Sequence, residues 1–203
     1  MSARRNHMRP TMVIAVTAAI ALAATALVLL LRGTATASPP GGELARISNE
    51  GEPVDVATGQ QQELQNVGAV SALRIATRAG RAFYRLLRPD GTVCYAVDMV
   101  GGDHLGNTSC PEPPTAFPTA TNPVLDLTLF ESTSHVLGDL HVVSAQGFAA
   151  DGVKSVALLD GSGRVVARER TSGNVYALGV PAGRVATSVV AYDAKHAEVY
   201  RAP

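Results

Sequence analysis

Residues 82–97 read AFYRLLRPDGTVCYAV, and this stretch gives the clearest indication of the fold. Apolar side chains alternate with other residues on both sides of a central Pro-Asp-Gly, as in strands with one buried face. Proline fixes φ and glycine accepts a positive φ, so the tripeptide predicts a tight turn. A hairpin closed there places Leu86 opposite Cys94 and Tyr84 opposite Ala96. Together with the alternating run before it, this hairpin predicts a three-stranded meander over 71–98.

The sequence holds two cysteines, Cys94 and Cys110. An even pair of cysteines in an exported chain predicts a disulfide. In the loop-entropy model, closing this loop would stabilise the folded state by about 3 kcal/mol. Two other uses compete with it. His104 next to a reduced thiol would form a nucleophile pair, and the same histidine with both cysteines would supply three of the four ligands of a structural zinc site. The disulfide is the favoured interpretation, in a β-meander unit over 71–110.

A second unit is predicted after a proline-rich boundary. Residues 111–123 contain five prolines, which favour an extended, semi-rigid linker. Seven strands are then expected, over 124–130, 139–146, 153–160, 163–170, 174–180, 184–192 and 197–201. So many short strands in one C-terminal unit predict an antiparallel β-sandwich over 124–203. Within it, the row Leu125-Leu127-Leu129 is expected to face the row Tyr176-Leu178-Val180 across the core, with Val156, Leu158 and one of Val189 and Val190.

Three stretches of the C-terminal unit carry a resemblance: Gly147-Phe148-Ala149-Ala150-Asp151-Gly152-Val153-Lys154-Ser155-Val156, Asp160-Gly161-Ser162-Gly163 and Val189-Val190-Ala191-Tyr192-Asp193. Their rhythm resembles that of bacterial immunoglobulin-like domains. The chain departs from that pattern at its end, where Asp193 is not followed by a glycine turn. The resemblance implies an extracytoplasmic β-sandwich used as a spacer or for adhesion, and it implies no catalytic residue.

The N-terminus predicts export. Residues 11–31 form an uncharged run of 21 residues, long enough as a helix to cross a bilayer. Three arginines precede the run and Arg32 follows it, so residues 1–10 are expected in the cytoplasm and the chain after the run outside. Two alternatives remain: a single-pass signal anchor in the cell membrane, or a secreted protein cleaved near Ala37. Residues 32–70 are predicted to be a tether or stalk, in which Thr58 and Gln61 suggest a capping box for a short helix over 59–67.

The distribution of charge limits the classes of function that the protein can have. The 203 residues carry no net charge, but residues 1–37 hold four arginines and no acid, so the remainder is acidic by four charges. This excludes a globally basic nucleic-acid binder. Five arginines with no acid among them could face a cell-envelope polyanion: Arg74, Arg78, Arg81, Arg85 and Arg88. The alternative for them is a solvated face that protects a strand edge.

Together these patterns predict a mainly β protein with an N-terminal transmembrane helix. We expect a non-catalytic binding or structural module with no cofactor and no metal, whose partners are the membrane, through residues 11–31, and an envelope polyanion or protein. The alternative function is an exported sensor or accessory subunit with its ligand site in the disulfide-linked unit. Nothing in the sequence has the spacing of a nucleotide-binding loop, a zinc protease motif or a serine-hydrolase elbow.

Overall fold

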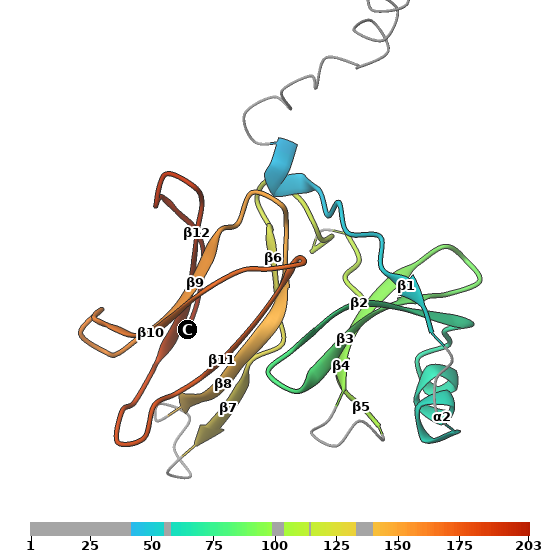
Figure 1. Cartoon of the computed structure of the whole chain (residues 1–203), viewed down its shortest axis with the longest axis horizontal. Helices are drawn as coiled ribbons and strands as arrows, with labels where there is room; N and C mark the ends of the chain where they lie inside the picture. The colour runs from blue at the N-terminus through green and yellow to red at the C-terminus, as the bar shows by residue number, and fades with distance from the viewer. Residues whose placement is uncertain (1–41, 55–57, 99–103, 114, 133–139) are drawn as a thin grey trace, which may run out of the picture. The chain divides into compact units, whose positions relative to one another are not determined.

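A computed structural model of the chain describes residues 42–54, 58–98, 104–113, 115–132 and 140–203 (Figure 1). Within them the protein is mainly antiparallel β-sheet, as predicted. The described residues all belong to one compact unit. The predicted transmembrane run 11–31 lies outside the described residues, and no helix within them has the length and apolar character to span a bilayer.

Five strands form the N-terminal sheet, in the order β1-β2-β3-β4-β5. Their bounds are Glu52–Pro53, Ser71–Arg78, Arg81–Leu87, Val93–Asp98 and Leu105–Ser109. The predicted meander is β2-β3-β4, and its register is confirmed, because Leu86 pairs with Cys94 and Tyr84 with Ala96. Gly91, at the predicted turn between β3 and β4, has a φ of 83°.

One face of the N-terminal sheet packs around the disulfide. Leu86, Cys94 and Ala96 are fully buried there, together with Leu64 from the helix α2 (Thr58–Asn66). The disulfide joins Cys94 to Cys110, as predicted. The helix expected over 59–67 is present as α2. The stretch expected as a tether also contains a 3-10 turn, η1 (Gly42–Ala45), and the strand β1, which pairs with β2.

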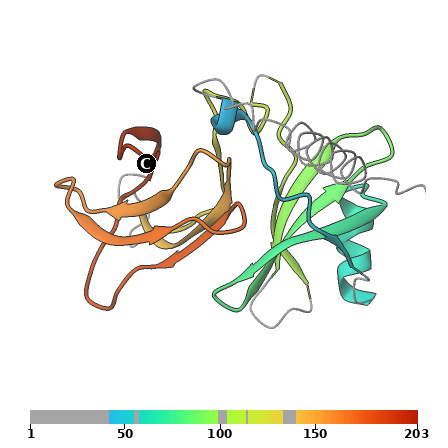
Figure 2. The same ribbon diagram turned by 45° about the horizontal axis from the view of Figure 1, so that its top comes forward.

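The remaining strands form two further antiparallel sheets (Figures 1 and 2). The middle sheet has the order β11-β8-β6, and β7 also pairs with β8. The outer sheet has the order β10-β9-β12-β13. The bounds of the middle sheet are Val175–Gly179 (β11), Leu140–Ala149 (β8), Val124–Asp126 (β6) and Leu129–Ser132 (β7). Those of the outer sheet are Val165–Arg170 (β10), Ser155–Leu159 (β9), Ser188–Tyr192 (β12) and Glu198–Ala202 (β13).

The predicted strand 124–130 is two strands, which corrects the sequence analysis. Asp126 accepts hydrogen bonds from the backbone N and the hydroxyl of Thr128, and this local turn interrupts the strand between β6 and β7. The Asp126 carboxylate binds the backbone and the hydroxyl of Thr128 two residues on, and an alternating pattern alone does not show such a break. The other six predicted strands are present, with ends that differ by a few residues.

The sandwich core lies between the middle and outer sheets. It includes Val156, Leu158, Tyr176, Leu178 and Val189, as expected, whereas Val190 lies in a separate small cluster on the opposite face of the outer sheet. The middle sheet and the N-terminal sheet share a second apolar cluster.

The expected position of the Leu125-Leu127-Leu129 row was wrong. Leu125 and Leu127 join the cluster between the middle and N-terminal sheets, with Phe83 and Phe148, and Leu129 is 39% exposed. The sandwich core receives the alternate residue Val124, and Asp126 bonds there to the hydroxyl of Tyr176. In a strand that is buried on both faces, both sets of alternate residues pack against apolar neighbours. The alternation in the sequence therefore does not show which set faces the sandwich core.

The proline-rich stretch predicted as a linker also contacts both units. Phe117 packs edge-on against Tyr95 of β4, with 5.1 Å between ring centroids. At its other end, the carbonyl of Pro123 accepts a hydrogen bond from the backbone N of Ala150. The stretch thus follows the junction of the N-terminal and middle sheets.

Candidate functional site

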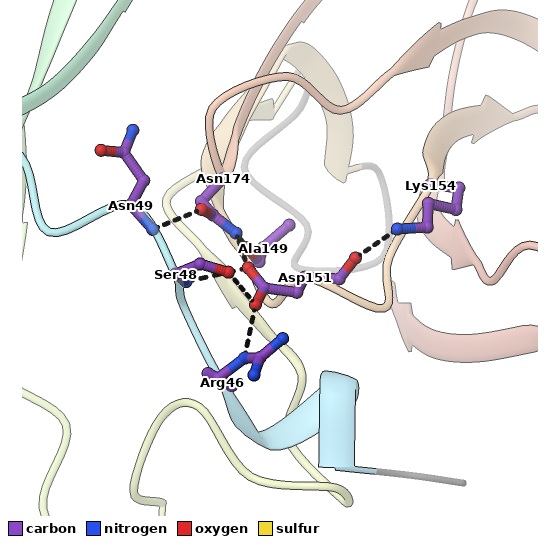
Figure 3. A network of polar contacts seen from close by, with 7 residues as sticks. All are labelled: Arg46, Ser48, Asn49, Ala149, Asp151, Lys154 and Asn174. Carbon is purple, nitrogen blue, oxygen red and sulfur yellow. Dashed lines mark hydrogen bonds and ion pairs between the residues drawn. The ribbon is translucent and has the colours of Figure 1, made fainter. Parts of the chain in front are cut away.

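A polar cluster surrounds Asp151, in the turn that follows β8 (Figure 3). One carboxylate oxygen accepts hydrogen bonds from the backbone N of Ser48 and the side-chain amide of Asn174, both at 2.9 Å. The other accepts from the Ser48 hydroxyl and, at 2.8 Å, from Arg46 Nε. All the donors to this one carboxylate come from the segment ahead of β1 or from the turn before β11.

The cluster holds the carboxylate in its charged form. Partial burial raises the pKa of Asp151, but the hydrogen bonds from Ser48, Asn174 and Arg46 outweigh that effect and lower it to about 2. An acid that is ionised throughout the physiological range and saturated with donors is poorly suited to proton transfer. The geometry of Asp151 therefore indicates a structural clasp.

The clasp extends to the N-terminal sheet through Asn49. Its backbone N donates to the side-chain oxygen of Asn174 at 3.3 Å, and its side-chain amide donates to the carbonyl of Ile75 in β2 at 2.7 Å. Asn174 has a φ of 65°, which asparagine tolerates better than most residues. Sequence reasoning missed this cluster. Its one visible signal was the Asp151-Gly152 turn, and the partners lie more than twenty residues away in the sequence.

Three of the five arginines predicted to face a polyanion donate hydrogen bonds within the protein. Arg78 forms an ion pair with Glu169 of β10 and donates to the carbonyl of Arg170 at 2.9 Å. Arg81 donates to the side-chain oxygen of Gln146 in β8. Arg85 donates to the carbonyl of Glu50 at 2.6 Å. Arg78 and Arg81 therefore join the N-terminal sheet to the strands of the sandwich.

The other two arginines lie at the margins of the N-terminal sheet. Arg74 is 3.8 Å from the Glu52 carboxylate, a loose pair between exposed side chains. The guanidinium of Arg88 lies near Gly68, in the loop between α2 and β2. The structure thus brings together neither these two nor the whole set of five on one free surface.

The cysteines and histidines do not converge on a reactive centre in the part of the chain that the structure describes. Cys94 and Cys110 are bonded to each other, so neither offers a thiol. Across the described ranges, no group of three His, Cys, Asp or Glu side chains is placed to hold a metal ion. His135 lies outside the described residues.

A cationic groove runs along the outer sheet. It has a volume of about 760 Å³ and is lined by the end of β10, the residue before β9 and the turn between β12 and β13. Its exposed cations are Lys154, Arg168 and Arg170, and His196 lies beside them. Lys154 also borders a smaller cavity of about 340 Å³ next to Asp151. This groove was not predicted, because its residues come from β10, the start of β9 and the turn between β12 and β13, which are far apart in the sequence.

Comparison of the chain with protein families, with curated proteins and with solved structures gives no match.

Proposed function

We propose that this protein is an exported, non-catalytic binding module held at the membrane by residues 11–31. The observation that carries the proposal is the Cys94–Cys110 disulfide within a packed core, since such bonds persist in oxidising compartments and are rare in the cytosol. The uncharged run and the arginines ahead of it support the same location. In the alternative, cleavage near Ala37 would release the module as a secreted protein.

We further propose that the C-terminal unit is an immunoglobulin-like domain. Two features support this: its paired antiparallel sheets enclose an apolar core, and its turn at Asp151-Gly152 carries the chain from one sheet to the other while that at Asp160-Gly163 joins the neighbouring strands β9 and β10. In this proposal the domain and the N-terminal sheet act as one platform, because Arg78 and Arg81 bridge them. A platform of fixed geometry suits a role in presenting a binding surface.

Thiol labelling in intact cells tests the exported location. The full chain should resist a thiol-reactive polyethylene glycol maleimide until a reductant is added, and then gain two labels. The Cys94→Ser variant is the matched control, because its remaining Cys110 should label without reductant. A Cys110 that stays unlabelled in intact cells of the Cys94→Ser variant would overturn the exported location, as would a C-terminal unit protected from protease in spheroplasts.

A cavity favours a second candidate function, a sensor with a ligand site in the N-terminal unit. It has a volume of about 720 Å³, lies between α2 and β2, and is lined by apolar residues such as Val54, Leu64 and Leu73. A cavity of this size matches those that hold small ligands. Anilinonaphthalene sulfonate should fluoresce with the full chain and lose that signal in Leu73→Lys. Equal fluorescence of both proteins would reject this candidate.

A further inference from the structure

Two arginines of the groove lie on one face of one strand. Arg168 pairs with Ala157 and Arg170 with Ser155, so both project from the side of the outer sheet that is opposite the sandwich core. Residues two apart on a strand are separated by about 6.5–7 Å along it. The strand therefore presents two guanidinium groups at a fixed repeat.

The acids near these cations are engaged elsewhere. Glu169 lies between the two arginines in the sequence, but its carboxylate pairs with Arg78. Asp193 accepts hydrogen bonds from the backbone N of Lys195 and of Ala197, both at 2.8 Å. Within the described ranges, neither groove arginine forms an ion pair with a carboxylate.

The remaining contacts of the groove leave its charge available. The guanidinium of Arg168 lies 4.6 Å from the centroid of the Tyr192 ring, a cation–π contact that orients it without neutralising it. Lys154 donates to the neutral backbone carbonyl of Asp151 at 2.6 Å. The chain after residue 37 is acidic overall, so a groove whose lining holds three cations beside Asp193 and the Arg78-paired Glu169 is a local exception.

We infer that the groove beside β10 binds a linear phosphodiester polyanion, with successive phosphates on Arg168 and Arg170 and a further contact from Lys154. Each guanidinium group can donate two parallel hydrogen bonds to the oxygens of one phosphate. The spacing of the two arginines along the strand also suits anionic groups repeated along an extended chain. The inference deepens the proposed function by naming its ligand class, and it depends on that proposal only for the location outside the membrane.

The five arginines singled out in the sequence do not carry this role. Glu169 pairs with Val156 of the sandwich core, so it projects from the opposite face of β10 to Arg168 and Arg170, and there its carboxylate forms the ion pair with Arg78. The groove owes its charge to its own cations, Lys154, Arg168 and Arg170.

A binding assay on the full chain in phosphatidylcholine nanodiscs tests the inference. The probe is a synthetic linear glycerol phosphate oligomer. Arg168→Gln with Arg170→Gln should weaken its binding about tenfold and make the loss of affinity with rising salt less steep. The control, Arg88→Gln with Arg184→Gln, removes the same charge outside the groove and should change affinity less than about twofold.

Each other outcome overturns the inference. Equal weakening by the two double variants would show attraction to net charge only. Equal affinity for monomeric glycerol 1-phosphate would exclude a linear polymer as the ligand. Binding to phosphatidylglycerol vesicles without binding to the oligomer would assign the phosphate to a lipid headgroup.

A second variant guards against loss of folding. Arg168 packs on Tyr192, so the double variant is checked by its thermal unfolding midpoint. Arg170→Gln changes an exposed side chain and should alone weaken binding about threefold. Unchanged binding in this folded variant would overturn the inference. The thiol-labelling test is independent, so loss of oligomer binding leaves the exported location standing.

Discussion

The two faces of the middle sheet meet different neighbours. On the side of the outer sheet, Tyr176 is fully buried among small aliphatic side chains, and its hydroxyl bonds to Asp126 at 2.9 Å. On the side of the N-terminal sheet, Phe148 packs against the rings of Phe83 and Tyr95, with centroids 5.5 and 4.8 Å away. One face buries a carboxylate–phenol pair, and the other is an aromatic contact.

This difference shows how the two units depend on each other. Strands that pack on one side only alternate between apolar and polar residues, but β8 ends with Phe148 and Ala149, both fully buried and on opposite faces. The aromatic face has no role in a sandwich by itself, since it needs the N-terminal sheet to cover it. The middle sheet therefore belongs to both units.

Of the variants that test this difference between the two faces, Phe148→Ala should lose the most free energy of unfolding. It removes the ring that contacts Phe83 and Tyr95, and truncating a buried Phe costs about 3–5 kcal/mol. Urea unfolding of the full chain measures the loss. Val143→Ala, on the same strand at a side chain that is 38% exposed, should cost less than about 1 kcal/mol. Similar losses in both variants would mean that the aromatic face adds little stability.

Gly147→Ala tests the spacing of the strands within the middle sheet. A Cβ at this glycine would lie 2.2 Å from the carbonyl oxygen of Leu125 and 2.7 Å from the Tyr176 hydroxyl, so β6 would have to move away. We expect a loss of about 3 kcal/mol in the free energy of unfolding. Gly179→Ala in β11 of the same sheet, with open space at its Cβ, is the control and should be nearly neutral. Comparable losses would argue against this close approach.

Asp126→Asn isolates the buried acid on the sandwich side. Burial raises the pKa of Asp126, despite hydrogen bonds from Thr128 and Tyr176, so the folded state favours the protonated form. The unfolding free energy of the wild type should then fall as pH rises above the unfolded value of about 3.8. Asparagine keeps an acceptor for Tyr176 and does not ionise. The unfolding free energy of the variant, relative to that of the wild type, should therefore rise by about 1 kcal/mol between pH 3 and pH 7. A constant difference across this range would refute the shift.

Asp151→Asn sharpens the contrast, because Asp151 lies outside both faces and has the opposite pKa shift. Its folded pKa, about 2, is below the usual 3.8, so its stabilisation is complete above pH 3.8 and is lost as pH falls toward 2. The variant should be less stable by about 1 kcal/mol at pH 7, with the deficit closing in acid. Thermal melts between pH 2 and 7 measure it. A deficit that persists at pH 2 would assign the effect to geometry and not to charge.

The sequence predicted local pairing well and long-range packing poorly. The Pro-Asp-Gly turn fixed the register of β3 and β4, and the two cysteines had one partner each available. The strand pattern also predicted antiparallel sheets. These features depend on neighbours in the chain or on simple counting, and both are visible in one sequence.

The candidate site was hidden for a physical reason. The arginines of β2 and β3 are charged and lack nearby acids in the sequence, yet Glu169 and Gln146 reach Arg78 and Arg81 from strands of the other unit. The groove cations come from separate segments of the sequence, and only the pairing of β9 with β10 and β12 brings them together. Which acid neutralises which arginine is decided by the packing of the sheets, and composition and spacing do not contain that information.

The clasp at Asp151 has a mechanical consequence. The chain that enters at Gly42 is fastened first to the turn after β8, where the Arg46 carbonyl accepts from the backbone N of Asp151 at 2.8 Å, and only then pairs with β2. In Figures 1 and 2 this blue segment crosses from the sandwich to the N-terminal sheet. Tension transmitted along the chain from residues before Gly42 therefore loads a small set of polar contacts in advance of either sheet. Under such tension, we expect these contacts to break before the pairing of β1 with β2 does.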